Sequence, residues 1–232
     1  MAALAPPAQV IAIDGPSGSG KGTVARLVAE HLGWHLLDSG ALYRLVALSG
    51  AARRLDPGDE PGHAALAAAL DARFEVDASG AERVLLDGRE VTRELRAEST
   101  GNMASVVAAM PAVRVALFER QRAFAQPPGL VADGRDMGTV IFPSAGLKVF
   151  LTASADERAR RRHKQLKEKG LAANLAGLSQ EILERDQRDA ARTTAPLKPA
   201  TDAVLIDSTG VPVEAVVQRI LDLARSRFLA IR

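Results

Sequence analysis

Nine residues near the N-terminus have the types and the spacing of a phosphate-binding loop. Residues 15–23 read G-P-S-G-S-G-K-G-T and fit the pattern G-x-x-x-x-G-K. The glycines let backbone N–H groups converge on an anion, and Lys21 supplies a positive charge for the β- and γ-phosphates of a nucleotide. The apolar stretch Val10–Ile13 predicts a strand before the loop, and Val24–His31 predicts a helix after it. Because strand and helix flank the loop as this chemistry requires, a chance glycine-rich turn is the weaker interpretation.

The residue after the lysine indicates which class of phosphate-binding protein the loop belongs to. Many NTPases place Ser or Thr directly after the lysine, where it holds Mg²⁺. Here that position is Gly22, and the hydroxyl comes one place later, at Thr23. We therefore expect no direct protein ligand for the metal, which phosphates and water would hold, while Thr23 would bond a phosphate. The G-K-G-T form is similar to that of nucleoside monophosphate kinases, which move a phosphoryl group from ATP to a small acceptor.

Two further segments could contact an acceptor. In D-S-G-A-L-Y-R, Ser39 could bond a base or a sugar, or it could simply cap a helix. Arg44 could reach an acceptor phosphate, or it could be a solvated helix charge. In D-G-R-D-M-G-T, Asp133 could orient Mg²⁺ through water, and Arg135 and Asp136 could face the acceptor. The alternative for this second segment is a structural network of aspartate and arginine in a turn.

Two charged helices are predicted late in the chain. The first covers Ala155–Lys169 and carries Arg158, Arg161 and Arg162, which could grip ATP phosphates or form a solvated basic face. The second covers Leu178–Arg192, and its spacing places Arg185, Asp189 and Arg192 on one face. A hairpin over residues 170–177 would join them, so that the pair could form a lid that closes over phosphates.

The elements that must position these groups are five apolar strands separated by helical patterns. The strands are Val10–Asp14, Trp34–Asp38, Leu130–Asp133, Lys148–Thr152 and Ala203–Asp207. This alternation predicts an α/β fold, a five-stranded parallel sheet with helices on both faces, whose ligands bind at the carboxyl ends of the strands. The segment Leu70–Arg96 breaks the rhythm: Phe74–Val76 and Arg83–Leu86 predict short strands around turns at residues 77–80 and 87–88. Pro212–Phe228 predicts a closing amphipathic helix.

Composition restricts the functional classes. Hydrophobic residues make up 47% of the 232 residues and support a core, although aromatic residues make up only 3%. Cysteine is absent, which excludes disulfides and thiolate chemistry, and the four histidines show no metal-ligand spacing. With no apolar run of membrane length and no signal-peptide pattern, we expect a cytoplasmic protein without a membrane partner. The net charge of +2 does not indicate nucleic-acid binding.

Four motifs together resemble those of bacterial cytidylate kinases, the family that phosphorylates CMP and dCMP with ATP. They are I-D-G-P-S-G-S-G-K-G-T, L-L-D-S-G-A-L-Y-R, P-G-L-V-A-D-G-R-D-M-G-T-V-I-F-P and E-R-D-x-R-D-x-x-R. The resemblance runs from about Val10 to the C-terminal helix. It implies one kinase domain over residues 1–232 with a P-loop NTPase-type core, a nucleoside-monophosphate region with a β-containing insertion at about 66–104, and a lid at about 155–177. It also implies a monomer that binds Mg²⁺ with ATP.

The resemblance also implies roles for individual residues. The ATP-binding residues would be Gly15, Pro16, Ser17, Gly18, Ser19, Gly20, Lys21, Gly22 and Thr23. The CMP-binding residues would be Ser39, Arg114 and Asp136 at the base, Ser105, Arg185 and Asp189 at the ribose, Arg44 and Arg135 at the phosphate, and Arg192 nearby. The catalytic residues would be Lys21, Arg135, Arg158 and Arg162, with Mg²⁺ held through phosphates and water near Asp133.

Three rival functions stay open at this point. A kinase for AMP, UMP or shikimate would use the same phosphate chemistry. A regulatory GTPase would need a guanine-reading N-K-x-D motif, which the sequence lacks; residues 207–210 fit D-x-x-G only as a short pattern. A nucleic-acid-binding module would have to use the charged helix 158–169. The low net charge and the scarcity of aromatic residues both argue against nucleic-acid binding.

Overall fold

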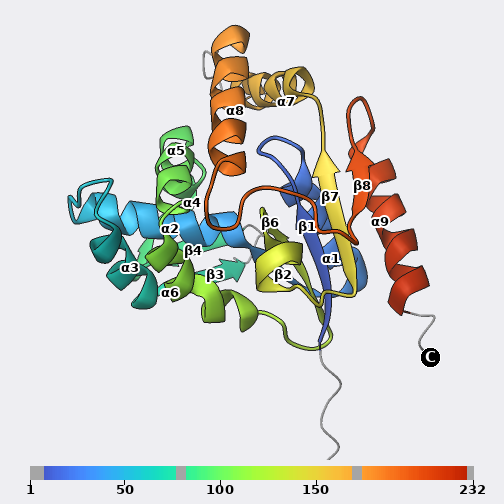
Figure 1. Ribbon diagram of the computed structural model, residues 1–232, viewed down its shortest axis with the longest axis horizontal. Coiled ribbons are helices and arrows are strands. Elements are labelled where there is room, and N and C mark those ends of the chain that lie inside the picture. The colour runs from blue at the N-terminus through green and yellow to red at the C-terminus, as the bar shows by residue number, and fades with distance from the viewer. Residues whose placement is uncertain (1–7, 77–81, 169–173, 229–232) are drawn as a thin grey trace, which may run out of the picture. The chain divides into compact units, whose positions relative to one another are not determined.

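A computed structural model of the protein describes residues 8–76, 82–168 and 174–228 (Figure 1). Contacts divide the chain into two compact units. The first comprises the residues up to Asp38 together with those from Arg122 onward, and the second comprises Ser39–Gln121.

The first unit is built on the five-stranded parallel sheet that the sequence predicts. Its strands lie in the order β2-β6-β1-β7-β8, and all neighbouring pairs are parallel. Their bounds are β1 Gln9–Asp14, β2 His35–Asp38, β6 Gly129–Gly134, β7 Leu147–Thr152 and β8 Val204–Asp207. Each agrees with its predicted range to within one residue at either end. Because β1 is central, the loop after it lies at the middle of the sheet's carboxyl edge.

Helices cover the sheet because alternate strand residues are apolar on both faces. The helices α1 (Lys21–Leu32) and α9 (Val213–Phe228) pack on the face that carries Ile11 and Ile13. The opposite face lies against the π-helical turn η1 (Met137–Ile141), whose Gly138 approaches both Asp14 and Lys148. The predicted arrangement of helices on both faces is thus present in this unit.

Two helices follow β7, in agreement with the predicted charged pair. They are α7 (Ala155–Glu168) and α8 (Leu175–Ala190), which pack against each other. The helix α8 begins earlier than predicted because Asn174 caps it, its side chain accepting a hydrogen bond from the N–H of Ala176 at 3.0 Å. The predicted hairpin 170–177 is therefore wrong over Leu175–Gly177, and its residues 170–173 lie outside the described residues. Arg192 lies just beyond the end of α8 rather than within it.

The second unit combines helices with a small antiparallel sheet. Its helices are α2 Ser39–Ala52, α3 Glu60–Ala68, α4 Thr92–Leu95, α5 Glu98–Val107 and α6 Pro111–Arg122, the last of which ends at the boundary with the first unit. Its strands are β3 Ala72–Val76, β4 Glu82–Leu86 and β5 Arg89–Glu90, in that order. The predicted pair of short strands is confirmed as β3 and β4, and the turn predicted at residues 77–80 lies outside the described residues.

The sequence pattern predicts the turn at Asp87 and Gly88 but not the two-residue strand β5 that follows it. Asp87 and Gly88 both have positive φ, 50° and 76°, as the tight turn between two antiparallel strands requires. That geometry returns the chain along β4, where Leu86 pairs with Arg89.

No single described helix is both long and apolar enough to cross a bilayer, although α5 and α6, which meet at a bend of 103°, satisfy the length and composition criteria as a pair.

Candidate active site

The loop after β1 has the backbone of a phosphate cradle, a name used here for residues 15–23. Gly15 has φ +157°, and a Cβ on it would lie 2.0 Å from the carbonyl oxygen of Leu151, so no side chain fits there. Gly18 and Gly20 have φ +77° and +89°, in the region that favours glycine. Gly20 is the N-cap of α1, whose first turn forms the end of the cradle, so the cradle lies at the positive end of a helix.

Lys21 is buried in the cradle and faces a carboxylate. Its Nζ donates to the carbonyl oxygen of Pro16 at 3.3 Å and lies 4.0 Å from Oδ1 of Asp133, at the end of β6. Burial, reinforced by the charge of Arg135, lowers the pKa of Lys21, and Asp133 partly offsets this. Burial raises the pKa of Asp133, and Lys21 partly offsets that shift. Both charges are therefore costly as they stand, and an anion near Lys21 would stabilise its charged form.

Two buried oxygens around the cradle lack a hydrogen-bond partner among the described residues. They are the hydroxyl Oγ of Ser19, a residue that is 1% exposed, and Oδ1 of Asp133. A buried polar atom without a partner is costly, so its persistence points to a ligand that completes its bonding.

Asp14, which the sequence predicts only as the end of a strand, holds the segment after β6 in place. Its two carboxylate oxygens accept hydrogen bonds from the N–H groups of Met137 and Gly138, each at 2.8 Å. Burial raises the pKa of Asp14 to about 6, although both hydrogen bonds oppose the shift. Asp14 thus joins the end of β1 to η1, and it positions the segment that carries Arg135 and Asp136. No local signal in the sequence could have identified partners 123 residues away.

Asp189 on α8 gathers two of the predicted arginines. Its Oδ2 accepts from Nε of Arg135 at 3.0 Å, and its Oδ1 accepts from Nη2 of Arg192. Burial alone would raise the pKa of Asp189, but Arg135 and Arg192 together hold it below the ordinary value. Arg185 adds to the positive field felt by both Asp189 and Lys21. The first unit therefore brings Arg135, Arg185, Asp189 and Arg192 together.

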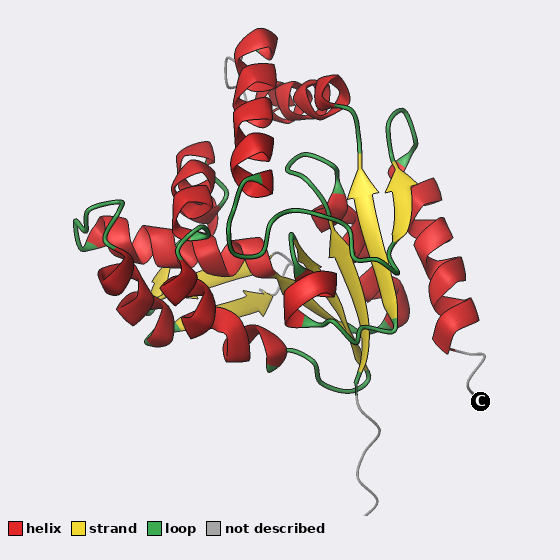
Figure 2. Cartoon of the chain, viewed as in Figure 1, coloured by secondary structure: helices red, strands yellow, loops and turns green. Residues whose placement is uncertain are grey.

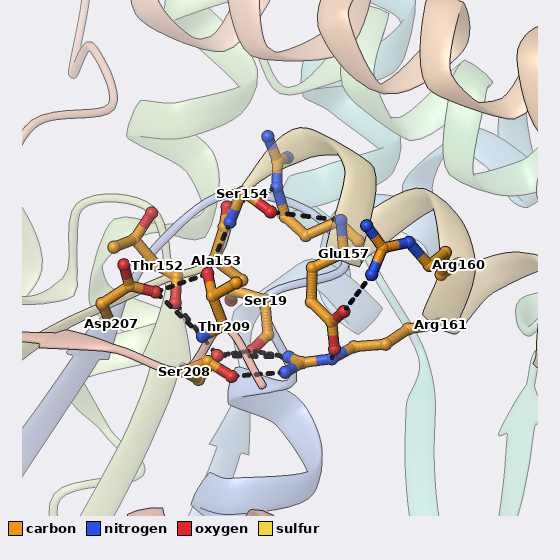
Figure 3. Close-up of polar contacts among 11 residues, drawn as sticks. Ser19, Thr152, Ala153, Ser154, Glu157, Arg160, Arg161, Asp207, Ser208 and Thr209 are labelled. Carbon is orange, nitrogen blue, oxygen red and sulfur yellow. Dashed lines mark hydrogen bonds and ion pairs between the residues drawn. The ribbon is translucent and has the colours of Figure 1, made fainter. Parts of the chain in front are cut away.

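The arginines of α7 differ in their surroundings. Arg158 is 4% exposed; it donates to the carbonyl oxygens of Ser17 (3.1 Å) and Ala153 (3.0 Å) and pairs with Asp186. Arg161 reaches the carbonyl oxygen of Ser19 (Figure 3). Arg158 and Arg161 therefore do not belong to a solvated basic face, which is the alternative prediction for this helix. Arg160, by contrast, is exposed. Arg162 is half-buried on the same helix.

The second unit holds the other four predicted acceptor residues. Ser39 begins α2 and is buried, and Arg44 on the same helix donates to the carbonyl oxygens of Leu95 (2.8 Å) and Ala97 (3.2 Å). Arg114 on α6 is buried, with its guanidinium 5.7 Å from the centre of the Tyr43 ring. Ser105 on α5 is 4% exposed, and its Oγ has no hydrogen-bond partner within the described chain. Arg44 is thus anchored rather than solvated.

The chain is similar in sequence to one family of known proteins. The model of the family described as cytidylate kinase matches residues 11–226. A cytidylate kinase of Pseudomonas aeruginosa is 59% identical over 213 residues, covering 91% of this chain and 93% of the relative. A cytidylate kinase of Bordetella bronchiseptica is 56% identical over 226 residues, covering 97% and 99%.

A solved structure of low sequence identity shares the fold. It is that of an uncharacterized protein from Eubacterium ventriosum, with a TM-score of 0.52 and 15% identity, covering 94% of this chain and 99% of the other. With its match to the family model over most of its length and its high identity to two curated relatives, the chain belongs to the cytidylate kinase family.

Proposed function

We propose that the protein transfers the γ-phosphoryl group of ATP to CMP or dCMP, giving ADP and CDP or dCDP. Family membership supports the reaction class. The single structural observation that carries the proposal is the buried Lys21 in the glycine cradle, opposite Asp133 and beside the unpartnered hydroxyl of Ser19. Such a site gains its missing bonds from nucleotide phosphates.

In this mechanism a phosphate oxygen of CMP attacks the γ-phosphorus of ATP in line, and the bond from that phosphorus to the bridging oxygen of ADP breaks. No protein base is needed because the attacking oxygen is already anionic. Lys21 holds the β- and γ-phosphates, and Arg135, Arg158 and Arg162 stabilise the charge that builds on the transferred group. Burial of Lys21 strengthens these interactions and keeps water from the reacting atoms.

The residues present fit a magnesium ion that ATP carries. Among the described residues there is no group of three or more acidic or histidine side chains that could hold a metal by itself. A single buried carboxylate, Asp133, has an oxygen without a hydrogen-bond partner in that part of the chain. This donor set suits an ion held mainly by phosphates and water, with Asp133 orienting the water. When bound, Mg²⁺ would neutralise charge on the phosphates.

For the acceptor we assign the roles that the family resemblance implies. In the first unit, Arg135 would hold the CMP phosphate, Asp136 the base, and Arg185, Asp189 and Arg192 the ribose and its surroundings. In the second unit, Arg44 would hold the phosphate, Ser39 and Arg114 the base, and Ser105 the ribose. The unpartnered hydroxyl of Ser105 and the two arginines on Asp189 support these assignments.

The proposal is tested by following ADP production from Mg-ATP with CMP, dCMP, UMP, AMP, GMP and shikimate as acceptors. Strong turnover confined to CMP and dCMP is the expected result. Turnover centred on AMP, UMP or shikimate would keep the phosphate chemistry and overturn the assignments at the base. Absence of turnover with every acceptor would overturn the proposed function.

A further inference from the structure

One side chain of α7 ties two loops at the carboxyl edge of the first unit to that helix. Arg161 lies on α7, which follows β7, and its guanidinium reaches both the phosphate cradle and the loop after β8 (Figure 3). Its Nη1 donates to the carbonyl oxygen of Ser19 and to Oγ of Ser208, each at 3.1 Å. Its Nη2 donates to the carbonyl oxygen of Ser208 at 2.6 Å, and its Nε donates to Oε1 of Glu157 at 2.9 Å. The guanidinium is thus occupied on all three nitrogens.

Ser208 closes the network. Its Oγ lies 3.1 Å from the carbonyl oxygen of Ser19 and 3.0 Å from that of Thr152. The hydroxyl has one proton, which serves one of the two carbonyls at a time, while its lone pair accepts from Arg161. Arg161, Ser208 and the Ser19 carbonyl therefore form a closed triangle, named here the cradle clamp.

The loop that carries Ser208 is itself rigidly built. Asp207 Oδ1 accepts from the N–H of Thr209 at 2.9 Å and from its hydroxyl at 2.7 Å. The same hydroxyl accepts from the N–H of Ser154 at 2.9 Å, just before α7. The loop after β8 and the start of α7 are thus joined, and in Figure 2 both follow the arrowheads of neighbouring strands. This arrangement gives Asp207, Ser208 and Thr209 a role that the short D-x-x-G pattern did not identify.

The clamp decides which way one peptide of the cradle faces. In the trans peptide between Ser19 and Gly20, the C=O and the N–H point in opposite directions. Because Arg161 and Ser208 hold the carbonyl of Ser19 toward α7 and β8, the N–H of Gly20 faces the opposite way. That N–H is at the N-cap of α1, where the helix dipole favours an anion. A flipped peptide would present a carbonyl oxygen to the phosphates and repel them.

A second, independent observation at the same residue points to a ligand. The side-chain hydroxyl of Ser19 is buried and has no hydrogen-bond partner within the described residues, and a Cβ on Gly15 would lie 3.4 Å from it. The clamp acts on the carbonyl of the residue that carries this hydroxyl, so it positions both groups at once.

We propose that Arg161 and Ser208 are positioning residues for the phosphate donor: they fix the Ser19–Gly20 peptide so that the Gly20 N–H and the Ser19 hydroxyl bind nucleotide phosphates. This inference rests on the proposed function for the identity of the ligand. It assigns Arg161 a role through the cradle, in contrast to a direct grip on ATP.

The test is the affinity for Mg-ADP, measured by calorimetry on Arg161→Gln, Ser208→Ala and the double variant. We expect Arg161→Gln to weaken binding about tenfold and Ser208→Ala about threefold. The double variant should bind within about twofold of Arg161→Gln, because residues in one network do not act additively. Arg161→Lys should restore part of the affinity, since a single ammonium can replace some but not all of the fork's bonds. The KM for CMP should stay unchanged.

Arg160→Gln is the matched control, because Arg160 is the neighbouring residue on the same helix, is exposed and contacts Glu157. If Arg160→Gln weakens ADP binding as much as Arg161→Gln does, the effect comes from the loss of positive charge in general and the proposal is wrong. A loss in Arg161→Gln with normal Ser208→Ala would overturn it in favour of direct contact between Arg161 and the nucleotide. If Arg161→Gln and Ser208→Ala lower the Tm but leave the ADP affinity unchanged, the network has only a structural role and the proposal is wrong. If Arg161→Gln does not fold, the ADP affinities of Ser208→Ala and Arg161→Lys still test the proposal.

The clamp and the proposed function can fail separately. ADP binding does not require an acceptor, so the clamp is tested even if the unmodified protein does not phosphorylate CMP. Conversely, turnover of CMP with unchanged ADP affinity in both variants would leave the function in place and remove the clamp.

Discussion

At the scale of single residues, the site is a set of charges that the fold makes costly. Lys21 and Asp133 are both buried, and burial shifts the pKa of each toward its neutral form. Asp189 is buried as well, yet two arginines keep its pKa low. Lys21 would therefore gain from an anionic ligand and Asp133 from a cation, whereas Asp189 already has its counter-charges.

Lys21→Ala should lower kcat by about a hundredfold or more, because one charge that stabilises the transferred phosphoryl group is lost. The Tm should change little, because the cost of burying the ammonium group disappears while Asp133 loses the charge that offsets its own burial. Steady-state turnover of CMP and a thermal melt measure the two effects. Lys164→Ala, on the exposed face of α7, is the control; near-normal turnover in Lys21→Ala would remove the lysine from the mechanism.

Asp189→Ala should raise the KM for CMP much more than the KM for ATP. The change removes the carboxylate that holds Arg135 and Arg192, both assigned to the acceptor. Initial rates with each substrate varied in turn give the comparison. Glu184→Ala, an exposed residue of the same helix, should leave both constants unchanged. Equal effects of Asp189→Ala on the two substrates would place Asp189 outside the acceptor site.

At the scale of elements, one buried carboxylate links a strand to a helical turn. Asp14 at the end of β1 accepts both N–H groups that begin η1, and burial raises its pKa from 3.8 to about 6. Below pH 3.8 the group is protonated in both the folded and the unfolded chain. Between the two pKa values the folded protein binds more protons, so its stability falls as the pH rises toward 6 and then stays level.

Asp14→Asn should therefore flatten the pH dependence of stability, by up to about 3 kcal/mol between pH 4 and pH 7. Urea unfolding of the variant and the unmodified protein at both pH values measures this difference. Asp133 contributes a shift of the same sign in both proteins, and the charge of Asp14 adds to that shift, so the comparison measures Asp14 together with its effect on Asp133. An identical pH dependence in the two proteins would contradict the assignment.

Two glycines should respond in opposite ways to alanine. A Cβ on Gly129, at the start of β6, would lie 2.4 Å from the Trp34 ring, which packs edge-on against Phe228 at 5.4 Å. Gly129→Ala should cost about 1–3 kcal/mol and shift Trp34 fluorescence, because the ring must move. Gly177→Ala, inside α8 with no atom closer than 4.0 Å, should stabilise by up to about 1 kcal/mol. Denaturant unfolding gives both values, and destabilisation by Gly177→Ala would contradict the helix start observed here.

At the scale of the whole molecule, nucleotide binding and stability are linked by mass action. Mg-ADP at 100 times its Kd should stabilise the protein by about 2.7 kcal/mol, raising the Tm by about 5–10 °C for a chain of this length. Trp34, the only tryptophan in the sequence, reports the unfolding of the first unit. The rise should be much smaller in Lys21→Ala, and an equal rise in that variant would show that ADP binds elsewhere.

Local patterns in the sequence determined the elements and the loop chemistry. The apolar runs predicted all five strands of the parallel sheet, because buried parallel strands are apolar on both faces. The glycine spacing predicted the cradle around Lys21, since only glycine fits where Gly15 meets the Leu151 carbonyl. The turn pair Asp87-Gly88 predicted the return of the chain, but not the short strand that follows it. The start of α8 at Asn174 was missed, although asparagine is a common helix cap.

Only the tertiary structure decided which distant groups meet. The partners of Asp14 lie 123 and 124 residues along the chain, and Ser208 lies 189 residues from the Ser19 carbonyl. These contacts depend on the strand order β2-β6-β1-β7-β8, which brings the loops after β1, β7 and β8 together. Periodicity and motif spacing describe one segment at a time and carry no information about strand order. For that reason the sequence could name Arg161 only as a candidate for gripping ATP phosphates, and its contacts with Ser19 and Ser208 appear only in the folded protein.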